Sequence, residues 1–229
     1  LGDFGIPEGI REVVGRRLSR LSDDVNQALA IAAVIGPVFD LAIVEGAGGP
    51  TGDQLFDALD EATQVGLIRE VPGSAGRYTF AHALVRSALY EELTTNRRVR
   101  MHWRVGEVIE SRNSADLDAH LDELAYHFSE GALAGDPEKA VDFARRAATR
   151  TVDDLAFESA EAHFERALGS LELVDHADPA VRCDLLLALA EAFHHGGDER
   201  RRATVFDAAQ AARSMGDAER LARAALVLV

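Results

Sequence analysis

The spacing of apolar residues predicts a helical start to the chain. Apolar side chains recur at helix spacing from Pro7 to Leu21, which predicts a first helix. A second helix, 25–35, follows the capping residue Ser22 and is apolar nearly all round, so we expect it at the centre of a core. A third helix is expected from Asp53 to the stop at Gly66.

Two short apolar runs after the third helix predict a β hairpin. They cover 67–71 and 77–80 and flank the turn-forming segment 72–76. An apolar segment, 39–44, and a glycine-rich loop, 46–52, connect the second and third helices. Three helices followed by a hairpin is the order of a winged-helix domain.

From Ala81 onward the pattern predicts only helices. The stretch 81–111 has a break near 94–96, and 113–116 is the best domain boundary. Further helices are expected near 118–132, 137–152, 155–173, 179–195, 199–214 and 217–228, with N-caps at Asp136, Asp198 and Asp217.

One of these helices carries the small-and-aromatic pattern Ala160, Phe164 and Ala167, which is typical of the second helix of a tetratricopeptide (TPR) unit. The sequence therefore predicts a mainly α protein with two domains. Residues 1–112 form a winged-helix domain with a long helical extension, and residues 113–229 form a TPR-like α-solenoid.

Composition limits the setting and the partners. The 229 residues are 47% apolar and 28% charged, as in soluble globular proteins. The sequence contains no run of 18 apolar residues, so we expect no membrane contact. The net charge of −15 disfavours general nucleic-acid binding. The single cysteine, Cys183, cannot form an internal disulfide, so a cytoplasmic location is expected. Because the chain starts at Leu1 without a methionine, we expect it to be part of a longer protein.

Two features that resemble ligand sites fail on chemical grounds. A phosphate-binding loop of the Walker type needs a lysine, and 46–52 has none. The third helix, which in a winged helix enters DNA, contains no Lys or Arg and presents Asp53, Asp57 and Asp60. We therefore expect a flexible loop and a structural or regulatory winged helix.

The remaining polar clusters predict neither a metal site nor an enzyme. Arg97, Arg98, Arg100 and Arg104 are expected to pair with Glu91, Glu92 and Glu107. Arg200–Arg202 is expected to be a solvated helix face. No set of histidines has metal-ligand spacing, His127 and His163 are expected to be partly buried, and Cys183 is expected in the core. No catalytic motif is present.

A polar stripe on the helix after the hairpin is the main candidate site. His82, Arg86 and Tyr90 lie four residues apart, beside an apolar arc formed by Leu84, Val85, Ala88 and Leu89. A histidine and an arginine so placed suit a phosphate or a carboxylate. The alternative is that His82 is a core-edge histidine bonded to a backbone carbonyl.

The segments 6–14, 16–22, 32–40 and 80–90, with Arg97, Arg98 and His102, resemble the region after the ATPase module in large bacterial STAND-type ATPases, which include the big LuxR-type regulators of actinobacteria. The resemblance covers 6–110 well and the helical array less specifically. It implies that the winged helix folds back onto the nucleotide module. It further implies that His82 contacts the β-phosphate of bound ADP, with Arg86 and Tyr90 at the same interface.

The resemblance also defines the partners to expect. The chain has no Walker A motif, no acidic metal-binding strand and no basic helix-turn-helix, so it should not hydrolyse ATP alone. ADP or ATP with Mg²⁺ would bind to the protein's own ATPase module. A protein or small-molecule effector would bind the repeats, and DNA would be bound only by a domain outside this chain. The alternatives are a stand-alone TPR-type adaptor and a DNA-binding winged-helix repressor.

Overall fold

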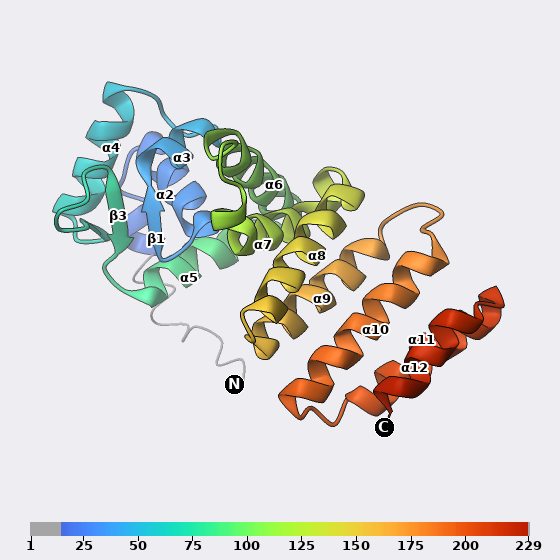
Figure 1. Cartoon of the computed structure of the whole chain (residues 1–229). Helices are drawn as coiled ribbons and strands as arrows, with labels where there is room; N and C mark the ends of the chain where they lie inside the picture. Colours follow the sequence, from blue (N-terminus) through green and yellow to red (C-terminus); the bar gives the residue numbers. More distant parts are fainter. Residues whose placement is uncertain (1–14, 229) are drawn as a thin grey trace. The chain divides into compact units, whose positions relative to one another are not determined.

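The computed structural model describes residues 15–228, and these are mainly helical (Figure 1). The chain divides between Arg112 and Asn113 into two compact units, which we call unit 1 and unit 2. Most of the helix expected at 7–21 lies outside the described residues. Among the described residues, none of the helices is both long and apolar enough to cross a membrane.

Helix α2 (Asp23–Ile35) is the centre of unit 1. Its N-terminus is capped by Ser22, whose Oγ accepts a hydrogen bond from the Val25 N–H at 3.3 Å. Every residue from Ala28 to Ile35 is buried, and the helix contacts four other helices and a strand. The central position predicted from its apolar pattern is confirmed.

A three-stranded antiparallel sheet lies beside this helix in order β1-β3-β2, with β1 at Val38–Asp40, β2 at Ile68–Glu70 and β3 at Arg77–Phe80. The β2–β3 hairpin was predicted, whereas β1 was not. The rings of Phe39 and Phe80 lie 5.5 Å apart, so β1 brings an aromatic side chain to the core beside β3.

The segment after β1 differs from the expected apolar connection. It forms the short helix α3 (Leu41–Gly46), because Asp40 caps it by accepting the Ala42 N–H at 2.8 Å. Helix α4 (Asp53–Gln64) follows, and Gly66 adopts the left-handed conformation (φ +73°) just beyond it, as its sequence predicts. Helices α5 (Ala83–Glu92) and α6 (Thr95–Arg112) confirm the predicted break near 94–96.

Unit 2 is a succession of helices, each in contact with the next along the chain. Figure 1 shows α8, α9 and α10 lying side by side. Small residues such as Ala144, Ala160 and Ala167 are fully buried, which allows neighbouring helices to approach closely. The elements are η1 (Asp118–His120), α7 (Leu121–Gly131), η2 (Ala132–Ala134), α8 (Pro137–Asp153), α9 (Phe157–Leu171), α10 (Pro179–Gly196), α11 (Arg201–Met215) and α12 (Ala218–Val227).

Aspartates cap several of these helices. Asp136 and Asp217 cap α8 and α12, as predicted, and Asp178 caps α10. The prediction for Asp198 was wrong, because α11 starts later, at Arg201. The Asp198 side chain instead accepts the Arg200 N–H at 2.7 Å and also binds the Arg200 guanidinium.

Candidate functional site: the start of helix α5

The predicted polar stripe does not lie on one helix. His82 precedes α5 with extended backbone angles (φ −142°, ψ 137°), and its side chain is exposed. The chain is still extended there because the Ala81 N–H donates to the Leu67 carbonyl at 2.9 Å, which continues the sheet by one bond. The common helical face proposed for His82 and Arg86 was therefore wrong.

Arg86 is half-buried and is used within the unit. Its Nε donates a hydrogen bond of 3.0 Å to the carbonyl oxygen of Ala33, near the C-terminal end of α2. A helix C-terminus carries unsatisfied carbonyls and a partial negative charge, so it is a favourable partner for a guanidinium. Arg86 thus ties α5 to α2 rather than pointing towards His82.

Tyr90 faces the helix that follows. Its hydroxyl lies 3.0 Å from Nε2 of His102 on α6, and the two rings meet edge to face at 5.8 Å. The Arg98 guanidinium lies 5.2 Å from the Tyr90 ring centre. Sequence reasoning noted His102 only as part of a motif, and no local signal indicated its pairing with Tyr90.

His102 is 1% exposed, and its environment keeps the imidazole neutral. Burial is the main cause that lowers its pKa to about 4, and the positive charges of Arg86 and Arg98 add to the effect. This group therefore stays uncharged at neutral pH while His82 faces solvent. The two histidines of this region have opposite environments.

The start of α5 can accept an anion. No side chain caps this helix, and the helix dipole is positive there. The Val85 N–H donates to the His82 carbonyl at 3.0 Å, so the N–H groups of Ala83 and Leu84 are the ones left for an anion. Among the described residues no hydrogen bond or ion pair engages the His82 side chain, so the backbone-carbonyl alternative is not seen. Leu84, expected in the apolar arc, is 42% exposed and borders the same end.

One glutamate of unit 1 makes a contact that its sequence did not predict. Glu107, expected to pair with an arginine, accepts a hydrogen bond from the Trp103 indole at 3.0 Å. In the loop 46–52, the Glu45 carboxylate accepts the Gly52 N–H at 3.1 Å. A carboxylate so close to the loop disfavours a phosphate, in agreement with the missing lysine.

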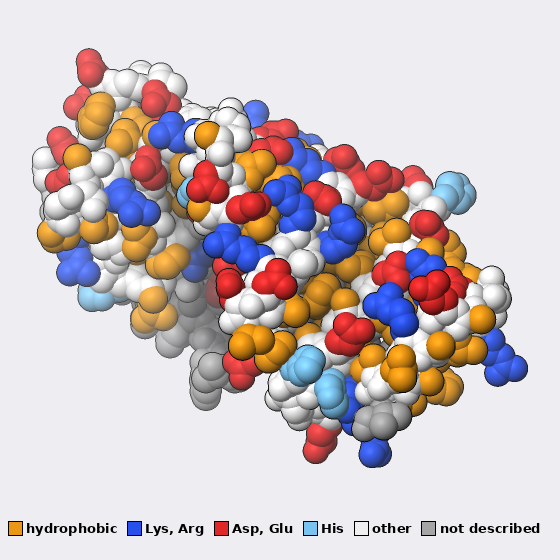
Figure 2. Space-filling view, viewed as in Figure 1, with side chains coloured by type: hydrophobic (Ala, Val, Ile, Leu, Met, Phe, Trp, Pro, Cys, Tyr) orange, Lys and Arg blue, Asp and Glu red, His pale blue; other side chains and the backbone are white. Residues whose placement is uncertain are grey.

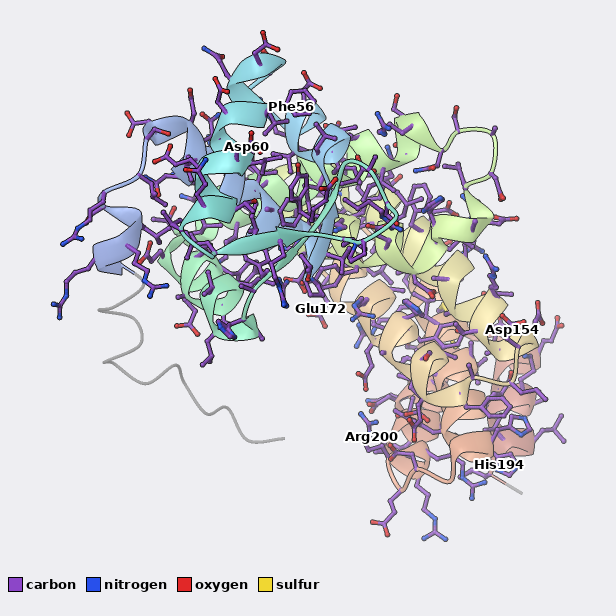
Figure 3. All side chains as sticks on the ribbon, turned by 90° about the vertical axis from the view of Figure 1, so that its left-hand side faces the viewer. Phe56, Asp60, Asp154, Glu172, His194 and Arg200 are labelled. Carbon is purple, nitrogen blue, oxygen red and sulfur yellow. The ribbon has the colours of Figure 1, made fainter. Side chains whose placement is uncertain are left out.

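Helix α4 has the acidic outer face that its sequence predicts. Asp53, Phe56, Asp57 and Asp60 follow at helix spacing and are exposed, while Leu55 and Leu59 are buried. Phe56 and Asp60 both project from this helix (Figure 3). This face repels a phosphate backbone.

Two histidines of unit 2 are more buried than expected. His127 is fully buried, and His163 is 6% exposed, with its Nε2 3.1 Å from the Asp122 carboxylate. Burial lowers the pKa of His163 although the aspartate opposes the shift. Within residues 15–228, no group of three or more His, Cys, Asp or Glu side chains could hold a metal ion. Cys183 is fully buried, as predicted.

Arg200 was expected on a solvated helix face; its side chain is 56% exposed, but the residue lies just before α11 and joins an ion-pair network. Its guanidinium binds Asp198, Glu165 and Glu161 and lies 4.4 Å from the Phe193 ring centre. It lies where α10 passes into α11 (Figure 3). Burial is the main cause that raises the pKa of Glu161. The network therefore fastens α9 to the start of α11.

In two polar cavities of unit 2, several of the arginines already bind other groups of the same unit. The first, about 710 Å³, includes Arg146 and Arg150, which bind Asp118 through its carboxylate and its carbonyl. The second, about 670 Å³, includes Arg201, which donates to the His194 ring. Figure 2 likewise shows acidic and basic side chains intermixed on the visible face. Neither cavity presents a concentrated charge of one sign.

Comparison of the chain with protein-family models, curated proteins and solved structures found no match. The residues and their geometry therefore carry the functional argument.

Proposed function

We propose that this chain is the regulatory and sensor part of a signal-transduction ATPase of the STAND type, a transcriptional regulator of the large LuxR class. Unit 1 would be a winged-helix domain that senses the nucleotide state. Unit 2 would be a TPR-like array that receives an effector or a protein partner. ADP or ATP with Mg²⁺ would bind in an ATPase module outside this chain.

The element order supports the winged-helix assignment of unit 1. The succession α2, β1, α3, α4, β2, β3 with sheet order β1-β3-β2 is what such a domain requires. The acidic outer face of α4 argues against DNA binding through this helix, so DNA would be bound by a separate output domain. Both observations favour a regulatory winged helix over a DNA-binding repressor.

The single observation that carries the nucleotide role is the exposed His82 at the uncapped start of α5. An imidazole N–H can donate to a phosphate oxygen, and the first N–H groups of a helix attract the same charge. Because Arg86 is bound to α2, we assign the phosphate contact only to His82 and the backbone N–H groups beside it.

Successive contacts between the helices of unit 2, with fully buried alanines at several of them, support the TPR-like assignment. Helical arrays expose an extended surface that suits a peptide, a protein or a small effector. The same features suit a stand-alone adaptor. The presence or absence of a nucleotide link therefore separates the two hypotheses.

The test measures ADP retention by the complete gene product. His82→Ala should weaken ADP retention on the order of tenfold, the loss expected for one charge-assisted hydrogen bond. His82→Gln, which keeps an N–H donor, should recover part of it. Arg77→Ala is the matched control, because it removes an exposed cationic side chain from β3 of the same unit.

Three outcomes would contradict the proposal. Unchanged retention in His82→Ala would make this residue an ordinary exposed histidine. A complete protein without a phosphate-binding loop and without bound nucleotide would favour the adaptor. Binding of this chain to duplex DNA at moderate salt would favour the repressor and refute the argument from the α4 face.

A further inference from the structure

A cavity of about 480 Å³ lies within unit 2, beside the connection between α9 and α10. One wall is a single face of α8, because Glu138, Val141, Asp142 and Arg145 follow at helix spacing. The opposite wall is the connecting segment 174–178 with Val181 in the first turn of α10.

The floor of this cavity is apolar. Val141 and Leu171 are 8% and 7% exposed, Val174 is half-buried and Val181 is 36% exposed. A volume near 480 Å³ lies within the range of small-molecule pockets, which combine apolar walls with a few polar groups. An apolar ligand body of modest size would therefore remove this floor from water.

The rim of the cavity is acidic. The cavity is lined by the carboxylates of Glu138, Asp142 and Asp178, by the Arg145 guanidinium and by the His176 imidazole, and Arg146 lies 3.8 Å from Asp142. Arg145 lies 3.2 Å from Asp142, so these two charges offset each other. Asp178 accepts the Ala180 N–H at 2.8 Å. Within residues 15–228 the Glu138 side chain has no ion-pair partner. It lies in the first turn of α8, whose positive end offsets part of its charge, and the rim keeps the remaining surplus of negative charge.

We propose that this cavity binds a small organic cation, an amine carried on an apolar body. The apolar floor would take the body, and Glu138 with Asp178 would take the ammonium group by charge and hydrogen bonding. The inference deepens the sensor role of unit 2 and rests on the proposed function for its biological purpose. The binding itself does not depend on nucleotide.

The test uses three probes with one body and different head groups, namely 4-phenylbutylamine, 4-phenylbutanol and 5-phenylpentanoate. Each is titrated into the full 229-residue chain without nucleotide, and methyl NMR signals of Val141, Val174 and Val181 report the site. The amine should bind best, and the carboxylate should bind on the order of tenfold more weakly, because it meets like charges.

Two variants examine the acidic rim. Glu138→Gln should weaken amine binding about threefold and leave alcohol binding unchanged, as expected for one partly exposed ion pair. Asp207→Asn on α11 is the control, since it removes an exposed carboxylate outside the cavity. It should leave the affinity for the amine unchanged.

Equal binding of the three probes, or no valine shifts up to millimolar amine, would overturn the inference. Equal effects of Glu138→Gln and Asp207→Asn on the affinity for the amine would overturn it as well. Amine binding together with normal ADP retention in the His82 variants would keep this site and remove the nucleotide role. Loss of ADP retention without amine binding would do the reverse.

Discussion

The buried His102 makes the stability of unit 1 depend on pH in a direction that can be worked out. Its pKa is about 4 in the folded protein, compared with 6.5 for an unperturbed histidine. As the pH falls below 6.5, the unfolded chain binds a proton that the folded protein binds only near pH 4. The contribution of this histidine to stability is therefore complete above pH 6.5 and is lost as the pH falls.

The size of the loss follows from the two pKa values. Between pH 7.5 and pH 5.0 the linkage relation gives about 2 kcal/mol of lost unfolding free energy from this one group. For a unit of this size that corresponds to a urea midpoint lower by about 1 to 2 M. The chain's only tryptophan, Trp103, lies in α6 next to His102, so its fluorescence reports the unfolding of unit 1.

Other groups titrate over the same range, so variants isolate the histidine. His102→Gln keeps a polar partner for Tyr90 and cannot titrate, so its stability should fall about 2 kcal/mol less than that of the unmodified chain over the same interval. His82→Gln, which removes an exposed histidine from the same unit, is the control. If both variants lose stability equally between pH 7.5 and 5.0, the reasoning is refuted.

Three further predictions concern packing. Gly49→Ala should destabilise unit 1 by about 1–3 kcal/mol in urea unfolding followed by Trp103 fluorescence, because a Cβ there would lie 2.7 Å from the Val44 carbonyl oxygen. Gly169→Ala should stabilise unit 2 by about 0.5–1 kcal/mol in urea unfolding followed by circular dichroism, because this helical glycine has open space around it. Cys183 should react with a thiol reagent only after unfolding, because it is fully buried and burial raises its pKa.

The helices of unit 2 could be predicted closely because their boundaries are local signals. Asp136 followed by Pro137 gives a cap and a first-turn proline within two residues, and the structure uses both. The strand β1 and the helix α3 were missed because elements this short show too little periodicity of apolar residues. Asp198 was misassigned because its carboxylate accepts the Arg200 N–H instead of capping a helix.

The candidate site was harder to predict because its contacts are not local. The spacing of His82 and Arg86 places them on one face only if the helix includes both, and a hydrogen bond between Ala81 and Leu67 prevents that. Arg86 contacts Ala33, 53 residues earlier in the sequence. No pattern within a window of one helix contains that information.

The contacts of α5 suggest how a signal at His82 would be passed on. The helix begins beside this histidine, is held to α2 through Arg86, and meets α6 through the pair of Tyr90 and His102. Helix α6 ends at Arg112, where unit 1 ends. A phosphate held at the start of α5 would therefore act on a helix that is fixed on both sides by buried or half-buried polar contacts. Because an effector shifts an equilibrium only by its differential contacts, the phosphate must favour one position of α5 over another. The Tyr90–His102 pair is where a displacement of α5 would first meet α6.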